Sequence, residues 1–320
     1  MEELPVIDKE VITNYFEKNA KKLETKPTNA SLKFENGNLI VVNGYNGKTV
    51  DVDKTILKIN SSLKNGETLI PIVFKETSPE VTAEDLQAKI GNINVLLGSF
   101  TTSYASSASG RKHNVELASD KINGKVLAPN ETFSYNSTIG YISSSTGWQT
   151  ATVFSGGKAV PGIGGGVCQV SSTLYNAVLY SNLEIVERHN HGLPVGYVKP
   201  SLDATVASGS GLDFKFKNSS DGYIYIRSKY SGGKLTVEIY GEKKDFEVEL
   251  TSKTLSTIAP ETVRIQDSKL EAGTEKVVES GSSGYVSEAY IKVTKNGTVI
   301  KNERLSKDTY RATKREIHYN

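Results

Sequence analysis

The chain has 320 residues, which predicts two or three domains, and its single cysteine excludes an internal disulfide, so packing must hold the fold together. Its 38 basic and 36 acidic side chains give a net charge of +2. This balance argues against a nucleic-acid-binding protein, which usually has a strong basic excess.

The first 91 residues are predicted to form a small α+β module. Helices are expected at 11–22, 53–63 and 82–90. Short strands are expected at 31–34, 39–42 and 69–74. Asp53 is the predicted N-cap of the second helix, and Thr82 with Asp85 approximates a capping box in the third.

The middle segment, 92–244, is predicted to be a second α+β domain. It is rich in glycine and carries the only cysteine, the only tryptophan and three of the four histidines. Helices are expected at 111–122 and 169–182, and strands at 92–102, 183–191, 212–217, 222–228 and 234–240.

The last segment, 245–320, follows the charged residues 243–245 and is predicted to be all strand and turn. Residues 246–250 alternate apolar and polar side chains with period two, and glycines punctuate the rest. The fold class predicted for the whole chain is therefore multidomain α+β, with an all-β C-terminal module.

Residues 164–177 (GGGVCQVSSTLYNA) place Cys168 in the first turn of a predicted helix, after three glycines. Glycines permit a tight bend and close approach of the backbone to a ligand. The free N–H groups and the helix dipole should lower the pKa of the thiol below its usual value of ~8.5. The same N–H groups could bind the oxyanion of a tetrahedral intermediate. The alternative is a structural cysteine that packs as a small hydrophobe.

The same segment supplies predicted substrate contacts. Cys168 shares one helix face with Ser171, Ser172 and Tyr175, while apolar residues form a buried stripe on another face. We expect this polar face, together with the backbone at Gly165 and Gly166, to contact the substrate.

Two histidines are candidate bases for the thiol. His189 and His191 are two residues apart on a predicted strand, so they are expected to face the same side. Either could pair with Cys168. His191 is preferred because Gly192 leaves space beside it, although one histidine could be active and the other merely exposed.

Three further residues complete the predicted site. Asp203 is the candidate carboxylate that orients the histidine. Arg188 is expected either to grip a substrate carboxylate or to be an exposed strand residue. Trp148, in the glycine-flanked stretch 147–157, is either part of a substrate wall or a core anchor. One cysteine and two histidines could also bind zinc, but their spacing matches no standard motif, so no metal is predicted.

Four blocks in order resemble the VanW domain family across about 110–240. They are 130–136 (NETFSYN), 164–177 (GGGVCQVSSTLYNA), 187–191 (ERHNH) and 203–206 (DATV). The chain departs from the family at 190–192, where the family tends to have Pro-His-Ser, and at 201–202, where Gly-Arg is usual. Residues 1–91 resemble a peptidoglycan-binding domain, and 245–320 resemble a G-five domain, a β module of surface and wall proteins.

The resemblance implies a function, because VanW domains are implicated as L,D-transpeptidases that use a cysteine. It predicts that the chain forms 3–3 crosslinks through a cysteine acyl-enzyme on the tetrapeptide stems of peptidoglycan, without a cofactor. Cys168 would be the nucleophile, with a base among His189 and His191. The alternatives are a non-catalytic wall-binding protein and a cysteine carboxypeptidase that transfers the stem to water.

The resemblance also implies an extracytoplasmic location, in the cell envelope of a Gram-positive-type bacterium. The first residues lack the basic and apolar regions of a signal peptide, and no run of about 18 apolar residues occurs. We therefore expect an export segment outside this sequence, which could also anchor the native protein to the membrane.

Overall fold

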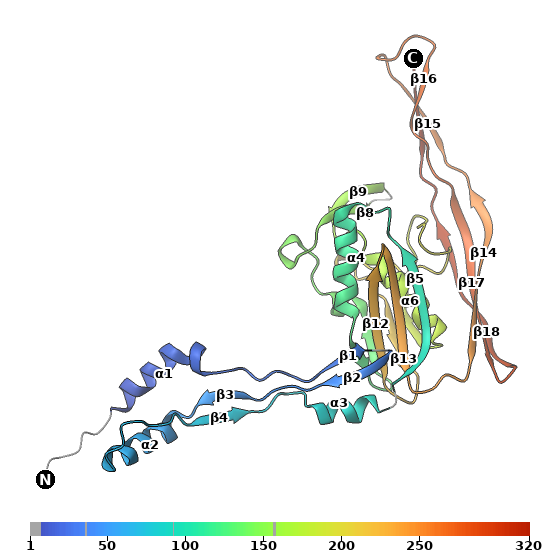
Figure 1. The fold of residues 1–320 in the computed structure, drawn as a ribbon. Helices are drawn as coiled ribbons and strands as arrows, with labels where there is room; N and C mark the ends of the chain where they lie inside the picture. Colours follow the sequence, from blue (N-terminus) through green and yellow to red (C-terminus); the bar gives the residue numbers. More distant parts are fainter. Residues whose placement is uncertain (1–7, 36, 92, 156–157) are drawn as a thin grey trace. The chain divides into compact units, whose positions relative to one another are not determined.

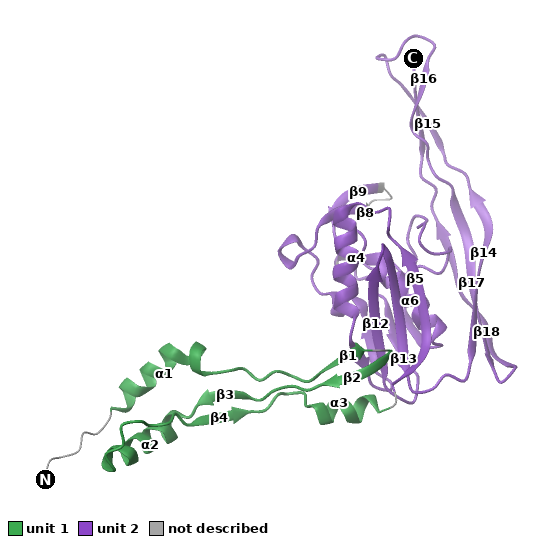
Figure 2. Ribbon diagram, in the orientation of Figure 1, with its two compact units in different colours: residues 1–91 green, residues 92–320 purple. Residues whose placement is uncertain are grey.

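The computed structural model describes residues 8–320 apart from 36, 92 and 156–157. The chain divides into two compact units, Met1–Gly91 and Asn92–Asn320 (Figure 2). In the described ranges, no helix combines the length and apolar character needed to cross a bilayer.

In its described residues, the first unit contains three helices and two antiparallel two-stranded ribbons. The helices are α1 (Lys9–Leu23), α2 (Val52–Lys64) and α3 (Ala83–Ile90). The ribbons pair β1 (Ser31–Glu35) with β2 (Asn38–Val42), and β3 (Gly47–Val50) with β4 (Phe74–Thr77).

Two local predictions for this unit need correction, and one is confirmed. The N-cap of α2 is Asp51, whose Oδ1 accepts the Lys54 N–H at 3.0 Å, so Asp53 lies within the first turn. The strand expected at 69–74 begins only at Phe74. The capping box of Thr82 and Asp85 in α3 is present in both directions.

A four-stranded antiparallel sheet forms the centre of the second unit (Figure 1). Its order is β5 (Val95–Ser103), β13 (Lys234–Gly241), β12 (Ile224–Ser231) and β6 (Lys125–Leu127). Helix α6 (Val167–Tyr180) contacts β5 and β13, while α4 (Ser109–Ile122) contacts β12 and α6. The two helices therefore cover one face of the sheet, and α6 is buried along almost its whole length.

Smaller elements surround this core. A three-stranded antiparallel sheet has the order β10 (Glu184–Glu187), β11 (Lys215–Lys217) and β7 (Thr132–Ser134). The hairpin β8 (Thr150–Ser155) and β9 (Lys158–Ile163), the helix α5 (Tyr135–Ile139) and the 3₁₀ turns η1 (Ser144–Thr146) and η2 (Ser208–Ser210) lie in the connections. The strand predicted at 183–191 ends at Glu187, because its partner β11 begins opposite at Lys215.

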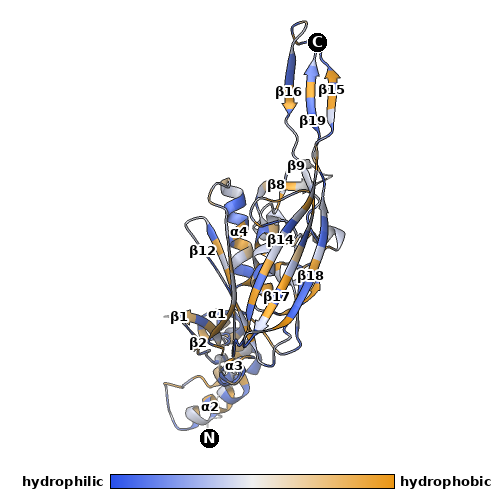
Figure 3. Cartoon of the chain, turned by 90° about the vertical axis from the view of Figure 1, so that its right-hand side faces the viewer, coloured by the Kyte–Doolittle hydropathy of each residue, from blue (hydrophilic) through white to orange (hydrophobic). Residues whose placement is uncertain are grey.

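The C-terminal part contains only strands and turns, as predicted. One antiparallel sheet has the order β14 (Glu247–Ile258), β17 (Gly284–Lys295) and β18 (Thr298–Tyr310). A second has the order β15 (Thr262–Gln266), β19 (Arg315–Tyr319) and β16 (Glu275–Glu279). Hydrophobic and hydrophilic bands alternate along β14 and β17 (Figure 3), and Leu250, Ala289 and Leu305 pack against the core that contains α6. The multidomain α+β class with an all-β C-terminal region is confirmed.

Candidate active site

The glycine loop before α6 has a conformation that requires glycine. Gly164 and Gly166 have φ angles of +85° and +116°, which residues other than glycine rarely adopt. A Cβ at Gly165 would lie 2.4 Å from the backbone oxygen of Thr152. The Asn114 amide braces the loop by donating to the Gly165 carbonyl at 3.0 Å. These constraints fix Cys168 as the second residue of α6.

Cys168 is half-buried and lines a cavity of about 780 Å³. Its sulfur lies 3.4 Å from the Val206 carbonyl oxygen and 3.7 Å from Thr205 Oγ1. Burial by itself raises the pKa of the thiol. The hydrogen bond and charge of His191, together with the contacts to Val206 and Thr205, lower this pKa by more than burial raises it. The net result is a Cys168 pKa below its usual value, which favours the thiolate.

His191 connects the thiol to a buried carboxylate. Its Nδ1 lies 2.6 Å from Asp203 Oδ2, and its backbone N–H donates to the same oxygen at 2.7 Å. The second ring nitrogen, Nε2, is thereby left to face the thiol, with the Tyr197 hydroxyl 3.4 Å away. Burial lowers the pKa of His191, but the hydrogen bonds to Asp203 and Cys168 raise it to about 9. At neutral pH the geometry therefore favours a thiolate–imidazolium pair.

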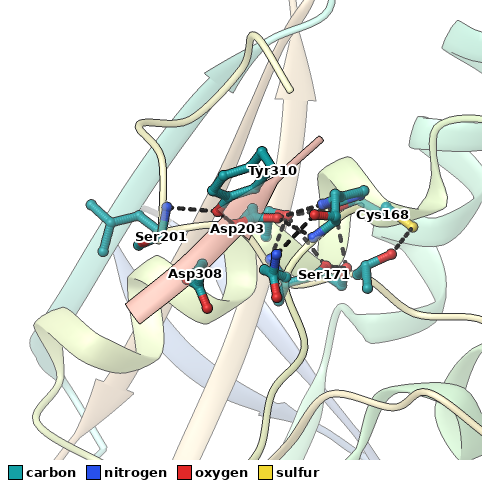
Figure 4. Close-up of polar contacts among 12 residues, drawn as sticks. Cys168, Ser171, Ser201, Asp203, Asp308 and Tyr310 are labelled. Carbon is teal, nitrogen blue, oxygen red and sulfur yellow. Dashed lines mark hydrogen bonds and ion pairs between the residues drawn. The ribbon is translucent and has the colours of Figure 1, made fainter. Parts of the chain in front are cut away.

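Asp203 is fully buried and is held from several sides (Figure 4). Besides His191, it accepts the Tyr310 hydroxyl at 2.5 Å and Arg188 Nη2 at 2.9 Å. Tyr310, the last residue of β18, also accepts the Ser201 N–H at 2.7 Å. Burial raises the pKa of Asp203, but the His191 hydrogen bond, Arg188 and Tyr310 lower it to about 2. The carboxylate is therefore charged at any physiological pH.

The two predicted histidines do not share a face, so that expectation is wrong. Because β10 ends at Glu187, residues 188–191 lie outside the sheet and lose the period-two alternation of a strand. The His189 side chain is 41% exposed and its Nε2 lies 3.0 Å from Glu187 Oε1. His189 is not among the residues that line the cavity with Cys168, whereas His191 is.

Arg188 is not an exposed strand residue, and it does not contribute to the wall of the cavity around Cys168. Its side chain is 8% exposed, and its guanidinium pairs with Asp203 and with Asp308 of β18, the latter at 2.7 Å. It does not line the cavity around the thiol. The donors that were expected to grip a substrate carboxylate are engaged inside the protein.

The polar face of α6 is covered, which corrects the predicted substrate contacts. Ser171 and Ser172 are buried and donate to the carbonyls of Cys168 and Ala204, which holds residues 202–206 against the helix. Tyr175 packs edge-on against Phe214 in the core. None of the three lines the cavity.

Of the remaining predicted contacts, two line the cavity. Gly165 and Gly166 form part of its wall beside Cys168. Trp148 is 2% exposed and belongs to the hydrophobic core, so the core-anchor interpretation holds. In the described part of the chain, no group of three or more His, Cys, Asp or Glu side chains is placed to hold a metal ion.

The sequence prediction missed several residues of this site, among them Arg111, Tyr197, Tyr310 and Arg311. Arg111, Tyr197 and Arg311 line the cavity, and the Tyr310 hydroxyl donates a hydrogen bond to Asp203. Arg111 begins a predicted helix, but nothing local indicates which neighbour it faces. Tyr310 and Arg311 lie more than 100 residues from the other site residues and reach them only through the tertiary fold.

Comparisons with known proteins match three families along the chain. VanW like protein matches residues 110–240, the G5 domain matches 249–319, and a peptidoglycan binding domain matches 4–70. The uncharacterized protein YoaR of Bacillus subtilis is 35% identical over 237 residues, which is 74% of this chain and 76% of that protein. The vancomycin B-type resistance protein VanW of Enterococcus faecalis is 27% identical over 136 residues, 41% of this chain and 49% of that protein.

Two solved structures are also similar to a part of the chain. The crystal structure of HP0197-G5 is 17% identical and covers 24% of this chain and all of its own, with a TM-score of 0.16. The G5 domain structure of an IgA1 protease is 19% identical and covers 24% of this chain and 93% of its own, with a TM-score of 0.18.

Proposed function

The chain belongs to the VanW-like family, and from this membership and the geometry around Cys168 we propose that it is a cysteine-dependent peptidoglycan L,D-transpeptidase. Its peptidoglycan-binding and G5 domains make it a cell-wall-associated protein. The observation that carries the proposal is the arrangement of His191 and Asp203 beside Cys168, which lies at the start of α6. We further propose domain boundaries at 91 and 244, and a Gram-positive-type envelope as the native location.

The arrangement supports acyl transfer more directly than binding alone. A protein that only holds glycan has no use for a cysteine of lowered pKa beside a buried, carboxylate-paired histidine. The same three groups have the order of nucleophile, base and orienting carboxylate that thiol acyl transfer requires. The cavity of about 780 Å³ is within the size range of sites for small molecules and short peptides.

In the first step, the Cys168 thiolate attacks the carbonyl that joins the third and fourth residues of a tetrapeptide stem. A C–S bond forms, and the oxyanion develops beside the N-terminus of α6, where the positive end of the helix dipole stabilises negative charge. Of the first backbone N–H groups of α6, those of Val167 and Gln169 already donate to the carbonyls of Gly164 and Gly166. The C–N bond then breaks. His191, protonated because its pKa is about 9, gives its proton to the departing D-alanine amine, and a thioester remains.

In the second step, the side-chain amine of a diamino acid on a neighbouring stem attacks the thioester. His191, now neutral, accepts a proton from this amine, and the thiolate leaves as the new amide forms. The product is a 3–3 crosslink. Asp203 holds the imidazole ring in one orientation through Nδ1 in both steps, so Nε2 carries the mobile proton.

The test is turnover of purified disaccharide-tetrapeptide by the full chain, followed by mass spectrometry. We expect a dimer that has lost one D-alanine, with no dimer from Cys168→Ala or His191→Gln. His189→Gln is the matched control, because this exposed histidine pairs with Glu187 and should leave crosslinking intact.

Other products would identify the alternative functions. A monomer that has lost D-alanine and gained water, without any dimer, would indicate a carboxypeptidase. A Cys168→Ala variant that still crosslinks would refute the proposed nucleophile. A folded protein that turns over no stem, and whose thiol reacts no faster than free cysteine, would indicate a wall-binding protein.

A further inference from the structure

The cavity around Cys168 is unbalanced in charge. Its described lining residues include Arg111, Arg311 and His191, and no aspartate or glutamate is among them. The ion pairs in the described ranges engage other arginines, namely Arg188, Arg227, Arg264 and Arg304. His191 is paired with Asp203, but no ion pair in the described ranges engages Arg111 or Arg311. Arginines that line a concave site without a carboxylate partner attract anions, and guanidinium binds carboxylate through two parallel hydrogen bonds.

Arg311 reaches this cavity from the C-terminal β domain. It follows Tyr310 directly, and its backbone N–H donates to the Gly192 carbonyl at 2.9 Å. A Cβ on Gly192 would lie only 3.1 Å from Arg311 Nη2, so the guanidinium lies over this glycine, one residue after His191. The hydrogen bond from Tyr310 to Asp203 fixes the end of the strand from which Arg311 extends.

Arg111 approaches from the opposite end of the reacting pair, beside the N-cap of α6. Its Cγ would lie 3.3 Å from a Cβ on Gly166, and its Nη1 donates to Ser107 Oγ at 2.8 Å. Burial lowers the pKa of Arg111, while the neighbouring Tyr197 and Cys168 oppose this shift. The Arg111 side chain therefore lies near the thiol, against Gly166, which precedes Cys168 by two residues. Arg111 thus faces the sulfur end of the site, and Arg311 the histidine end.

We propose that Arg111 and Arg311 form a carboxylate-binding pair that selects an anionic substrate, and that the C-terminal β domain supplies half of it. If the proposed function is taken as the premise, this pair indicates the acyl donor, which is a stem whose reacting end carries two free carboxylates. One belongs to the fourth residue, and the other to a third residue that is a diamino dicarboxylic acid. A stem with lysine in the third position, or with that carboxylate amidated, offers only one.

The first test uses the thiol alone and needs no stem. Iodoacetamide and iodoacetate alkylate a thiolate in the same way, by displacement of iodide, but only iodoacetate is an anion. We expect the iodoacetate-to-iodoacetamide rate ratio to be higher for Cys168 than for free cysteine. Arg111→Gln and Arg311→Gln should each lower this ratio about threefold to tenfold, since each removes one nearby cation. Because both reagents probe the same sulfur, a general loss of reactivity cancels in the ratio.

Two further variants separate charge from structure. Arg304→Gln changes an arginine of β18 that pairs with Glu288 and does not line the cavity, so its ratio should equal that of the wild type. Arg311→Lys keeps the charge and should retain most of the wild-type ratio. A wild-type ratio equal to that of free cysteine, or a Gln variant with an unchanged ratio, would overturn the pair.

The second test measures kcat/KM for two tetrapeptide stems that differ only in a free or amidated carboxylate on the third residue. The wild type should prefer the free acid by about tenfold or more, and the Gln variants should lose that preference. Equal use of both stems by the wild type would overturn the assignment of substrate. If the alkylation ratios change as expected while neither stem reacts, the anion site stands and the transpeptidase proposal fails.

Discussion

Replacing Asp203 with asparagine removes the charge that holds His191 protonated. The side-chain hydrogen bond to Asp203 is the strongest of the contacts that raise the pKa of His191, and burial, the largest influence, acts against it. The pKa stands at about 9 against an ordinary 6.5, a difference worth about 3 kcal/mol. Without the carboxylate, we expect the pKa of His191 to return to about its ordinary value.

This change should lower the reactivity of the thiol. At pH 7.5, a group of pKa 9 is about 97% protonated and one of pKa 6.5 only about 9%. Because the imidazolium stabilises the thiolate, iodoacetamide should alkylate Cys168 about tenfold more slowly in Asp203→Asn than in the wild type. Asp308 still pairs with Arg188 in this variant, so the cation is not left buried alone.

The assay is the rate of alkylation between pH 5 and pH 10, with circular dichroism to confirm folding. Glu187→Gln is the matched control, because it alters the other carboxylate–histidine pair, that of His189, and should leave the rate unchanged. A folded Asp203→Asn protein that reacts at the wild-type rate across this range would refute the role of the carboxylate. So would a Glu187→Gln variant that slows as much.

Three further predictions concern the same region. In His189→Ala, the rate of Cys168 alkylation and the rate of crosslinking should stay within about twofold of the wild-type rates, since the His189 side chain is 41% exposed. The folded-state pKa of Asp203, about 2, lies below its ordinary 3.8, so its contribution of about 2 kcal/mol is present above pH 4 and lost as the pH falls toward 2. Urea unfolding at pH 5 and pH 2 should show that the free energy of unfolding falls less between these two pH values in Asp203→Asn than in the wild type. Gly166→Ala should destabilise the protein by about 1–3 kcal/mol in the same assay, because residue 166 has a φ of +116° and an added Cβ would lie 3.0 Å from Val115 Cγ2. Gly209→Ala is the control and should leave the free energy of unfolding unchanged, because an added Cβ there meets open space.

Local patterns in the sequence predict most of the elements. The helical spacing after the glycine loop indicates α6, and the alternation at 246–250 indicates β14. The boundaries near the site are less accurate. The segment 183–191 is predicted to be one strand, but each residue of β10 needs a partner, and the pairing with β11 ends at Lys215. Pairing in space, which a local pattern does not encode, therefore decided the orientation of both histidines.

The sequence by itself determined that Cys168 lies at the start of a helix, since this depends only on glycines that tolerate positive φ and on residues spaced to form that helix. The tertiary structure decided what surrounds the thiol. A helical pattern shows which side chains share a face but not what covers that face, so Ser171 and Tyr175 were expected to be open and are buried. The tertiary structure also brings Tyr310 to Asp203 and Arg311 to Gly192, although these residues are distant in the chain, because the C-terminal sheet packs against the core that contains α6.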